Sequence, residues 1–288
     1  MTLVILGCGY VGTRLARTAL AAGRAVRACS RSTGKLEPLK ALGVEVKYVD
    51  ASNQKHLTSA MSSMSGGTVV YSIPPVADLP PGRAMRAALQ AAYGGGATCF
   101  VYLSSAGLYG DSPDDDVWID EDTPVAVDDG PMANVRSDEA EIDACSHNRL
   151  RVVTLRLAPV YGPGRGVRMR LHKGDYRLLD GGTHAISRIH VDDAVAAILA
   201  AEAHGPDKSR FLVADDEPTT QLDYATWLTQ RMGLPMPPSR TRFEPGKQRV
   251  AHRNRRIRNA RMKAVLGVTL TYPTFREGEA AIEAELQG

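Results

Sequence analysis

Short apolar runs recur along the first 160 residues, and stretches of helical composition separate them. The runs at 3–6, 25–29, 44–49, 68–73, 99–103 and 152–157 have the length and composition of strands in a buried sheet. Helix-forming residues fill the intervals 13–22, 35–42, 83–93 and 131–146. Strands that alternate with helices in this way predict an α/β fold with a doubly wound parallel sheet.

The turn after the first strand carries the pattern Gly-x-Gly-x-x-Gly at 7–12 and opens the first helix. In such a turn the glycines allow a sharp bend, close approach to a pyrophosphate and tight packing of the helix on the strand. The helix start adds free N–H groups and a positive dipole end. The pattern is weak alone, but its place between strand and helix predicts an NAD(P)-binding Rossmann domain. The cofactor-binding residues predicted here are Gly7, Gly9, Tyr10, Val11 and Gly12.

The ends of the second and third strands bear on which dinucleotide binds. Where an NAD-preferring domain has an acidic residue, this chain has Arg31 between two serines. A guanidinium and the hydroxyl of Ser32 suit a 2′-phosphate, so the sequence predicts NADP, with NAD as the alternative. Arg31 could equally be an ordinary exposed arginine. Asp50 ends the third strand and could accept from the adenine amino group or cap the next helix.

Later strands deliver further candidates to the same edge of the sheet, where ligands bind in open α/β sheets. Ser72, Ile73 and Pro74 follow the fourth strand and are predicted to lie beside the ribose or nicotinamide. Ser104 and Ser105 end the fifth strand. The aspartate-rich segment 111–129 that follows is interpreted as a flap over the site or as solvated surface.

A rigid turn at 159–166, rich in proline and glycine, marks the predicted domain boundary. Residues 1–165 are predicted to form the NAD(P)-binding Rossmann domain. Residues 166–288 are predicted to form a smaller substrate-binding region or cap, with 189–215 packing back on the Rossmann domain.

Composition narrows the class of protein. The chain has 288 residues, 43% of them hydrophobic and 23% charged, which is typical of a soluble globular protein. No apolar run approaches the ~20 residues of a membrane helix, and no basic segment precedes an apolar core as in a signal peptide. Four cysteines without metal-like spacing indicate buried thiols, no metal site and a cytoplasmic location.

Residues 240–263 hold ten Lys and Arg against the single acid Glu244, although the whole chain carries only +3. Such a run could contact nucleic acid or an anionic ligand. A solvated surface is the plainer interpretation. Only Phe243 interrupts the basic residues as an aromatic, so nucleic-acid binding is not favoured.

Five motifs in order make the chain resemble an extended or atypical short-chain dehydrogenase/reductase of the NAD-dependent epimerase/dehydratase family. They are residues 7–12, 102–110 (Tyr-Leu-Ser-Ser-Ala-Gly-Leu-Tyr-Gly), 120–124 (Asp-Glu-Asp-Thr-Pro), 155–165 (Leu-Arg-Leu-Ala-Pro-Val-Tyr-Gly-Pro-Gly-Arg) and 189–193 (Ile-His-Val-Asp-Asp). The resemblance covers nearly the whole chain. It implies hydride exchange with a nicotinamide, a small-molecule substrate and a homodimer.

The resemblance also implies a catalytic Ser and a Tyr-x-x-x-Lys pair, in which the tyrosine acts as acid and base. Ser105 matches the serine. Met132 stands where the tyrosine belongs and Arg136 where the lysine does, and Gly107 replaces a frequent hydroxyl residue. A thioether cannot transfer a proton, whereas Arg136 remains a candidate for binding ribose or phosphate.

Three other residues are candidates for the missing acid/base group. Tyr109 or Tyr161 could supply a relocated phenol, or both could be packing residues. His190 is better explained by a structural hydrogen bond beside a helix start.

Two functions follow from these observations. The first is an NADP-dependent oxidoreductase or epimerase with a modified active site, acting on a small polar, sugar- or nucleotide-linked substrate. The second is a non-catalytic NADP(H) sensor or regulatory protein, which the missing tyrosine and lysine would suit.

Overall fold

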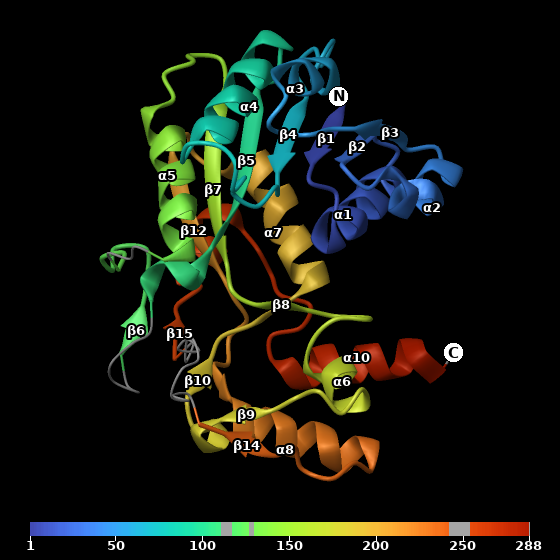
Figure 1. Ribbon diagram of the computed structural model, residues 1–288, viewed down its shortest axis with the longest axis vertical. Coiled ribbons are helices and arrows are strands. Elements are labelled where there is room, and N and C mark those ends of the chain that lie inside the picture. The colour runs from blue at the N-terminus through green and yellow to red at the C-terminus, as the bar shows by residue number, and fades with distance from the viewer. Residues whose placement is uncertain (111–116, 127–129, 242–253, 288) are drawn as a thin grey trace.

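The computed structural model describes residues 1–110, 117–126, 130–241 and 254–287, and its central feature is a sheet of seven parallel strands (Figure 1). In spatial order the strands are β12 (Ser209–Val213), β7 (Arg151–Leu157), β5 (Cys99–Ser105), β4 (Thr68–Tyr71), β1 (Leu3–Leu6), β2 (Val26–Ser30) and β3 (Glu45–Tyr48). The chain starts at β1, moves outward to β3, and returns past β1 to build the other half. The predicted doubly wound parallel sheet is confirmed, with its topological switch point between β1 and β4.

Helices cover both faces of the sheet. Successive residues of each strand point to opposite sides, so both faces of the sheet carry apolar side chains that the helices bury. In β1, Leu3 and Ile5 join the core under one group of helices, and Val4 and Leu6 join the core under the other. The first group is α1 (Tyr10–Ala21), α2 (Glu37–Ala41), α7 (Val191–His204) and α9 (Ala260–Leu266). The second is α3 (Gln54–Ala60), α4 (Arg83–Gly94) and α5 (Pro131–Ala144). Short 3₁₀ turns, η1 (Thr33–Leu36) and η2 (Ala106–Tyr109), follow β2 and β5.

A smaller group of elements lies beyond the carboxyl ends of the strands, in the lower half of Figure 1. Its helical elements are α6 (Val167–His172), η3 (Asp180–Gly182), α8 (Gln221–Met232) and α10 (Phe275–Gln287). Its strands are β8 (Val160–Tyr161) with β11 (Ile189–His190), β9 (Leu178–Leu179) with β14 (Ser239–Arg240), and β10 (Ala185–Ile186) with β13 (Thr219–Thr220). The aromatic side chains of Tyr161, Tyr224 and Phe275 lie in its core. This group faces the edge of the sheet at which the sequence predicts a ligand.

Helix α7 and strand β12 belong to the main sheet layer, although they come late in the chain. Strand β12 pairs with β7, and α7 packs against α1, β5 and β7. The segment 191–213 is therefore part of the same core as the strands before it. The division of the chain at residue 165 stays a prediction.

The flap and the basic run meet where the structure describes them. Strand β6 (Trp118–Ile119) pairs with β15 (Arg256–Ile257), and the Arg258 guanidinium lies 5.5 Å from the centre of the Trp118 ring. Arg261 forms an ion pair with Asp122 at 2.7 Å. The predictions for 111–116, 127–129 and 242–253 lie outside the described residues. Over the described residues, no helix is long and apolar enough to span a membrane.

Candidate functional site

The three glycines of the turn between β1 and α1 differ in how much space surrounds them. Two are closely packed and one is open. Gly7 has φ +83°, and a Cβ there would lie 2.7 Å from the backbone carbon of Ser72, so only glycine fits. A Cβ on Gly12 would lie 3.0 Å from the Ile5 side chain, which shows how closely α1 packs on β1. A Cβ on Gly9 would have nothing nearer than the Gly7 oxygen at 3.9 Å. The space in front of Gly9 is therefore open.

Helix α1 presents its N-terminus to that space without any capping side chain. Gly9 is the N-cap residue, and no acidic residue stands in the first turn. The first hydrogen bond of the helix runs from Thr13 N–H to the Gly9 oxygen at 2.8 Å. The N–H groups of Tyr10, Val11 and Gly12 therefore have no acceptor within the helix. These donors and the positive end of the helix fit an anionic pyrophosphate.

The ends of β2 and β3 lie next to this turn, since both strands follow β1 in the sheet. Ser30 Oγ accepts a hydrogen bond from Ser32 N–H at 3.0 Å, and the Arg31 side chain is exposed. Asp50 accepts from Ser52 N–H at 3.0 Å and from the Ser52 hydroxyl at 2.8 Å. These bonds lower the pKa of Asp50, and the charge of Arg31 adds to the effect. Of the two roles predicted for Asp50, that of helix cap is wrong, because Asn53 caps α3. The contact with the adenine amino group stays a prediction.

The segment after β4 borders the glycine turn from the other side. Ser72 donates its N–H to the Leu6 oxygen at 2.8 Å, directly beside Gly7. Ser72 and Ile73 are half-buried and Pro74 is exposed. The structure thus brings the residues predicted after β4 together with the β1–α1 turn.

The end of β5 forms the other half of the site, and its two serines have different roles. Ser104 is buried and donates its hydroxyl to Glu139 Oε1 at 2.6 Å. Ser105 is half-buried, and its Oγ accepts from Gly107 N–H at 3.0 Å. Among the described residues the Ser105 hydroxyl donates no hydrogen bond, so its proton can be donated to a bound molecule.

Met132 lies directly beside Ser105, as the motif alignment implies for the residue in the tyrosine position. A Cβ on Gly107 would lie 2.8 Å from Met132 Sδ and 2.9 Å from Ser105 Oγ. The thioether thus reaches the space that a side chain at 107 would occupy. The two departures from the family pattern, Gly107 and Met132, fit each other sterically.

The hydroxyl oxygen of Tyr109 is bound by a buried arginine. Its Oη accepts from Arg156 Nη1 at 2.6 Å, and only 7% of the residue is exposed. Arg156 also binds Glu139 with both its Nε (3.0 Å) and its Nη2 (2.6 Å). Burial raises the pKa of Tyr109. The phenol is therefore held neutral in a buried ion-pair network under the site.

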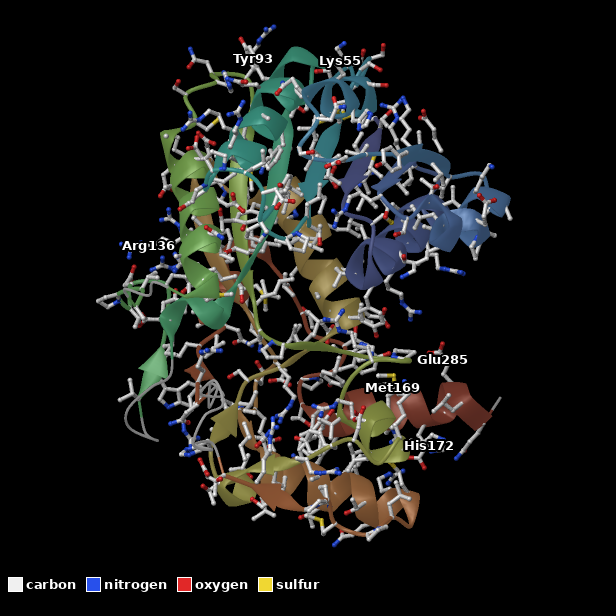
Figure 2. All side chains as sticks on the ribbon, viewed as in Figure 1. Lys55, Tyr93, Arg136, Met169, His172 and Glu285 are labelled. Atoms are coloured by element: carbon white, nitrogen blue, oxygen red, sulfur yellow. The ribbon has the colours of Figure 1, made fainter. Side chains whose placement is uncertain are left out.

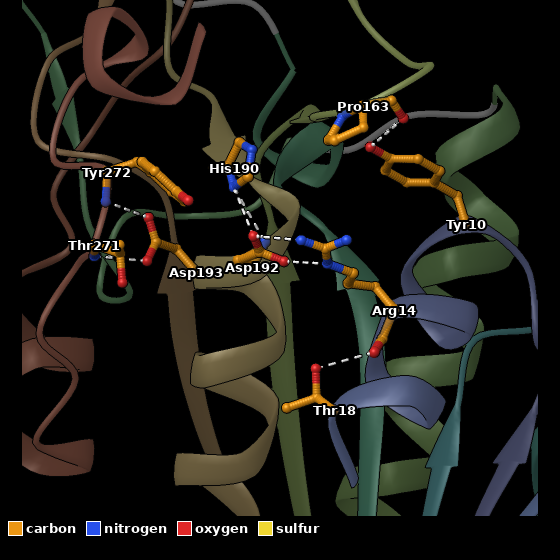
Figure 3. Close-up of polar contacts among 9 residues, drawn as sticks. All are labelled: Tyr10, Arg14, Thr18, Pro163, His190, Asp192, Asp193, Thr271 and Tyr272. Carbon is orange, nitrogen blue, oxygen red and sulfur yellow. Dashed lines mark hydrogen bonds and ion pairs between the residues drawn. The ribbon is translucent and has the colours of Figure 1, made fainter. Parts of the chain in front are cut away.

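The other two acid/base candidates lie farther along the chain and are also buried. Tyr161 Oη has no hydrogen-bond partner among the described residues and abuts Gly278 of α10, and burial raises its pKa. His190 Nδ1 accepts from Asp192 N–H at 3.3 Å and caps α7 (Figure 3). Burial lowers the pKa of His190 to about 4. The helix cap supports the structural interpretation of His190.

Arg136 is not brought to the cleft. Its side chain is exposed and points outward from α5, on the side of that helix away from α1 (Figure 2). The residues that sequence reasoning missed are Glu139 and Arg156. An arginine inside the otherwise apolar run 152–157 is the signal that could have indicated a buried acidic partner.

The match to known proteins decides the family. A family model described as the NAD dependent epimerase/dehydratase family matches residues 3–214. The chain belongs to this family. The resemblance drawn from the five motifs is thereby confirmed.

Members and structural relatives of the epimerase/dehydratase family differ in what their names describe. The chain is 29% identical over 313 residues to 3-diazoavenalumate denitrifying reductase from a Streptomyces species, a match that covers 96% of this chain and 99% of that one. It is 30% identical to a conserved protein of unknown function from Silicibacter pomeroyi DSS, with a TM-score of 0.81 and coverage of 99% and 98%. A third structure, MoeE5 in complex with UDP-glucose and NAD, has 22% identity, a TM-score of 0.76 and coverage of 99% and 98%. At that identity the last comparison shows the fold alone.

Proposed function

We propose that the protein is an NADP(H)-dependent reductase of the epimerase/dehydratase family that works on a small polar substrate without a catalytic tyrosine. The observation that carries the proposal is the open space at Gly9 in front of the uncapped start of α1. Tyr10, Val11 and Gly12 would hold the pyrophosphate with backbone N–H groups.

Arg31 supports NADP over NAD, because an exposed guanidinium and no carboxylate stand at the end of β2. Ser30 Oγ and Ser32 would bind the same 2′-phosphate. Asp50 keeps one carboxylate oxygen free of the Ser52 turn and would accept from the adenine amino group. Ser72, Ile73, Pro74 and the backbone of Ser104 would line the ribose and nicotinamide. We leave Arg136 out of this set, because it points away from the cleft.

A bound reduced nicotinamide supplies a hydride, and the side chains beside it determine which acceptors are suitable. Ser105 would orient the acceptor with its hydroxyl group, whose remaining oxygen lone pair can face a cation and whose proton can be donated to a carbonyl oxygen. Met132 has no proton to give, and burial raises the pKa of Tyr109, which makes its phenol a poor proton donor. An acceptor that already carries a positive charge needs no proton from the protein when it gains a hydride, because the product is neutral. A carbonyl oxygen, by contrast, must be protonated.

The name of the Streptomyces relative supports reduction over epimerisation, and it describes a diazo compound as substrate. Aryldiazonium and iminium cations are therefore the first acceptors to test, beside sugar nucleotides such as UDP-glucose. The four buried free cysteines support a reducing, cytoplasmic location. We also propose that the protein forms a homodimer, without assigning its interface.

The second candidate function is a non-catalytic NADP(H) sensor. Met132 in the tyrosine position and the outward direction of Arg136 favour it.

A panel of acceptors at matched concentration separates the two functions. We would measure NADPH oxidation with 4-carboxybenzenediazonium, an N-methyl iminium salt, 4-carboxybenzaldehyde and UDP-4-ketoglucose, each corrected for the reaction without protein. The proposal predicts turnover of the cationic acceptors, reduced ~10-fold or more by Ser105→Ala. Met132→Tyr should improve only the carbonyl acceptors. NADPH binding without turnover of any compound would replace the reductase by the sensor.

A further inference from the structure

The turn after β8 is built to approach the first residue of α1. Gly162 and Arg165 exchange two backbone hydrogen bonds, of 3.1 and 3.0 Å, that close the turn. Gly164, inside it, has φ +70°. A Cβ on Gly162 would lie 2.5 Å from Tyr10 Oη. The glycine at 162 therefore lets the turn come into contact with the start of the dinucleotide-binding helix.

Two contacts fix this turn, residues 162–165, to Tyr10. Tyr10 donates its hydroxyl to the Pro163 oxygen at 3.1 Å, as Figure 3 shows. The Arg165 guanidinium lies over the Tyr10 ring, 5.0 Å from its centre. Stacking on an aromatic ring orients a guanidinium without occupying its N–H donors. Arg165 is thus held at the N-terminus of α1 with its donors available.

Two arginines lie close to Tyr10, and among the described residues only one of them, Arg14, has an ion-pair partner. Arg14, one turn along α1, forms a two-point ion pair with Asp192, with an Nη2–Oδ2 distance of 2.9 Å (Figure 3). Arg165 is exposed and forms no ion pair with any carboxylate of the described residues. Glu285 of α10 acts on Tyr10 and Arg14 only through longer-range electrostatics. A guanidinium therefore stands beside the positive end of a helix, an arrangement that an anion between them would stabilise.

We propose that Arg165 binds the pyrophosphate of the dinucleotide from the side opposite the N–H groups of α1. The inference rests on the proposed function, and it assigns the two arginines of the cleft to different phosphates. Arg31 at the end of β2 recognises the 2′-phosphate, whereas Arg165 recognises the pyrophosphate that NAD and NADP share.

Equilibrium binding distinguishes these roles without any need for turnover. We would titrate wild type, Arg165→Ala, Arg31→Ala and Arg170→Ala with NADPH, NADH, ADP and adenosine by calorimetry. Arg165→Ala should weaken NADPH, NADH and ADP to a similar extent, ~10-fold or more, and leave adenosine unchanged. Arg31→Ala should weaken NADPH far more than NADH. Arg170 is a matched control, since it is an exposed arginine stacked on Tyr176 and paired with Asp175.

Each other outcome contradicts the inference in a distinct way. If Arg165→Ala binds ADP and NADH like wild type, Arg165 does not contact the pyrophosphate. If it weakens adenosine as much as ADP, the substitution acts through the shape of the site, and the phosphate contact is rejected. Arg165→Lys should recover part of the ADP affinity if charge is what matters. A wild-type protein that binds neither dinucleotide refutes the proposed function itself, which separates that failure from a failure of Arg165.

Discussion

The two ends of the cleft are built from different kinds of group. At the nucleotide end, between β1 and α1, the features are backbone N–H donors and the space left at Gly9. At the acceptor end, between β5 and α5, they are side chains that meet across separate elements, with Ser105 beside Met132. The nucleotide end keeps the general pattern of its fold, whereas the acceptor end departs from its family at Gly107 and Met132. Binding and chemistry can therefore change independently in this protein.

The two ends of the cleft also differ in the environment of a carboxylate. Asp50, at the nucleotide end, lies in a turn whose hydrogen bonds lower its pKa. Asp138 of α5 is 3% exposed, and burial raises its pKa to about 6. Tyr102 donates its hydroxyl to Asp138 Oδ2 over a long distance of 3.5 Å. The acceptor end thus buries a carboxylate that is costly to ionise.

The larger expected effect is the response of Asp138→Asn to pH. Because the pKa of Asp138 is higher in the folded protein than in the unfolded chain, the wild type loses stability as pH rises from about 4 to about 6. The amide cannot ionise, so the variant should be more stable than wild type by ~2 kcal/mol at pH 7.5 and equal to it near pH 4. Urea unfolding at both pH values measures this difference.

Asp78→Asn is the control for Asp138→Asn, because Asp78 is exposed. Its free energy of unfolding should change by less than ~0.5 kcal/mol at either pH. A variant at Asp138 that tracks the wild type across the whole range would contradict the buried, poorly solvated carboxylate.

A smaller effect tests the fit between Gly107 and Met132. Gly107→Ala places a methyl group 2.8 Å from the sulfur and should lower the free energy of unfolding by ~1 kcal/mol. Met132→Ala removes the obstacle, so the double variant should lose less than the two single variants added together, by ~0.5 kcal/mol or more. Denaturant unfolding of all four proteins completes the cycle. Strictly additive losses would mean that the two residues do not share the space.

The fold could be predicted from the sequence because its signals are local. Apolar runs such as 68–73 and 152–157 marked the strands, and the glycine pattern at 7–12 marked the turn at the switch point. The expected single helix at 35–42 is in fact η1 followed by α2, with Pro38 in the first turn of α2. The two-residue pairs such as β6 with β15 were not predicted, because so few residues leave no periodic pattern.

The acceptor end could be predicted only in part. The motif alignment placed Met132 and Ser105 in one site, and the structure places them side by side. The partners of Tyr109 and Ser104 could not be found, because Glu139 and Arg156 are distant in sequence and meet only through the packing of α5 on the sheet. The direction of Arg136 depends on how α5 is rotated about its axis, which a spacing of four residues does not determine.

The central claim, that the β1–α1 turn binds NADPH, is tested most directly by titrating wild type, Gly9→Ala and Gly94→Ala with NADPH. A Cβ fits at either glycine, with nothing within 4 Å at Gly94 and only the Gly7 oxygen at 3.9 Å for Gly9, so both variants should fold with nearly unchanged melting temperatures. We expect wild type and Gly94→Ala to bind with a Kd well below ~1 mM. Gly9→Ala should bind at least ~10-fold more weakly, because its methyl group occupies the space for the pyrophosphate. Equal NADPH affinity in all three proteins, or none in the wild type, would contradict the account.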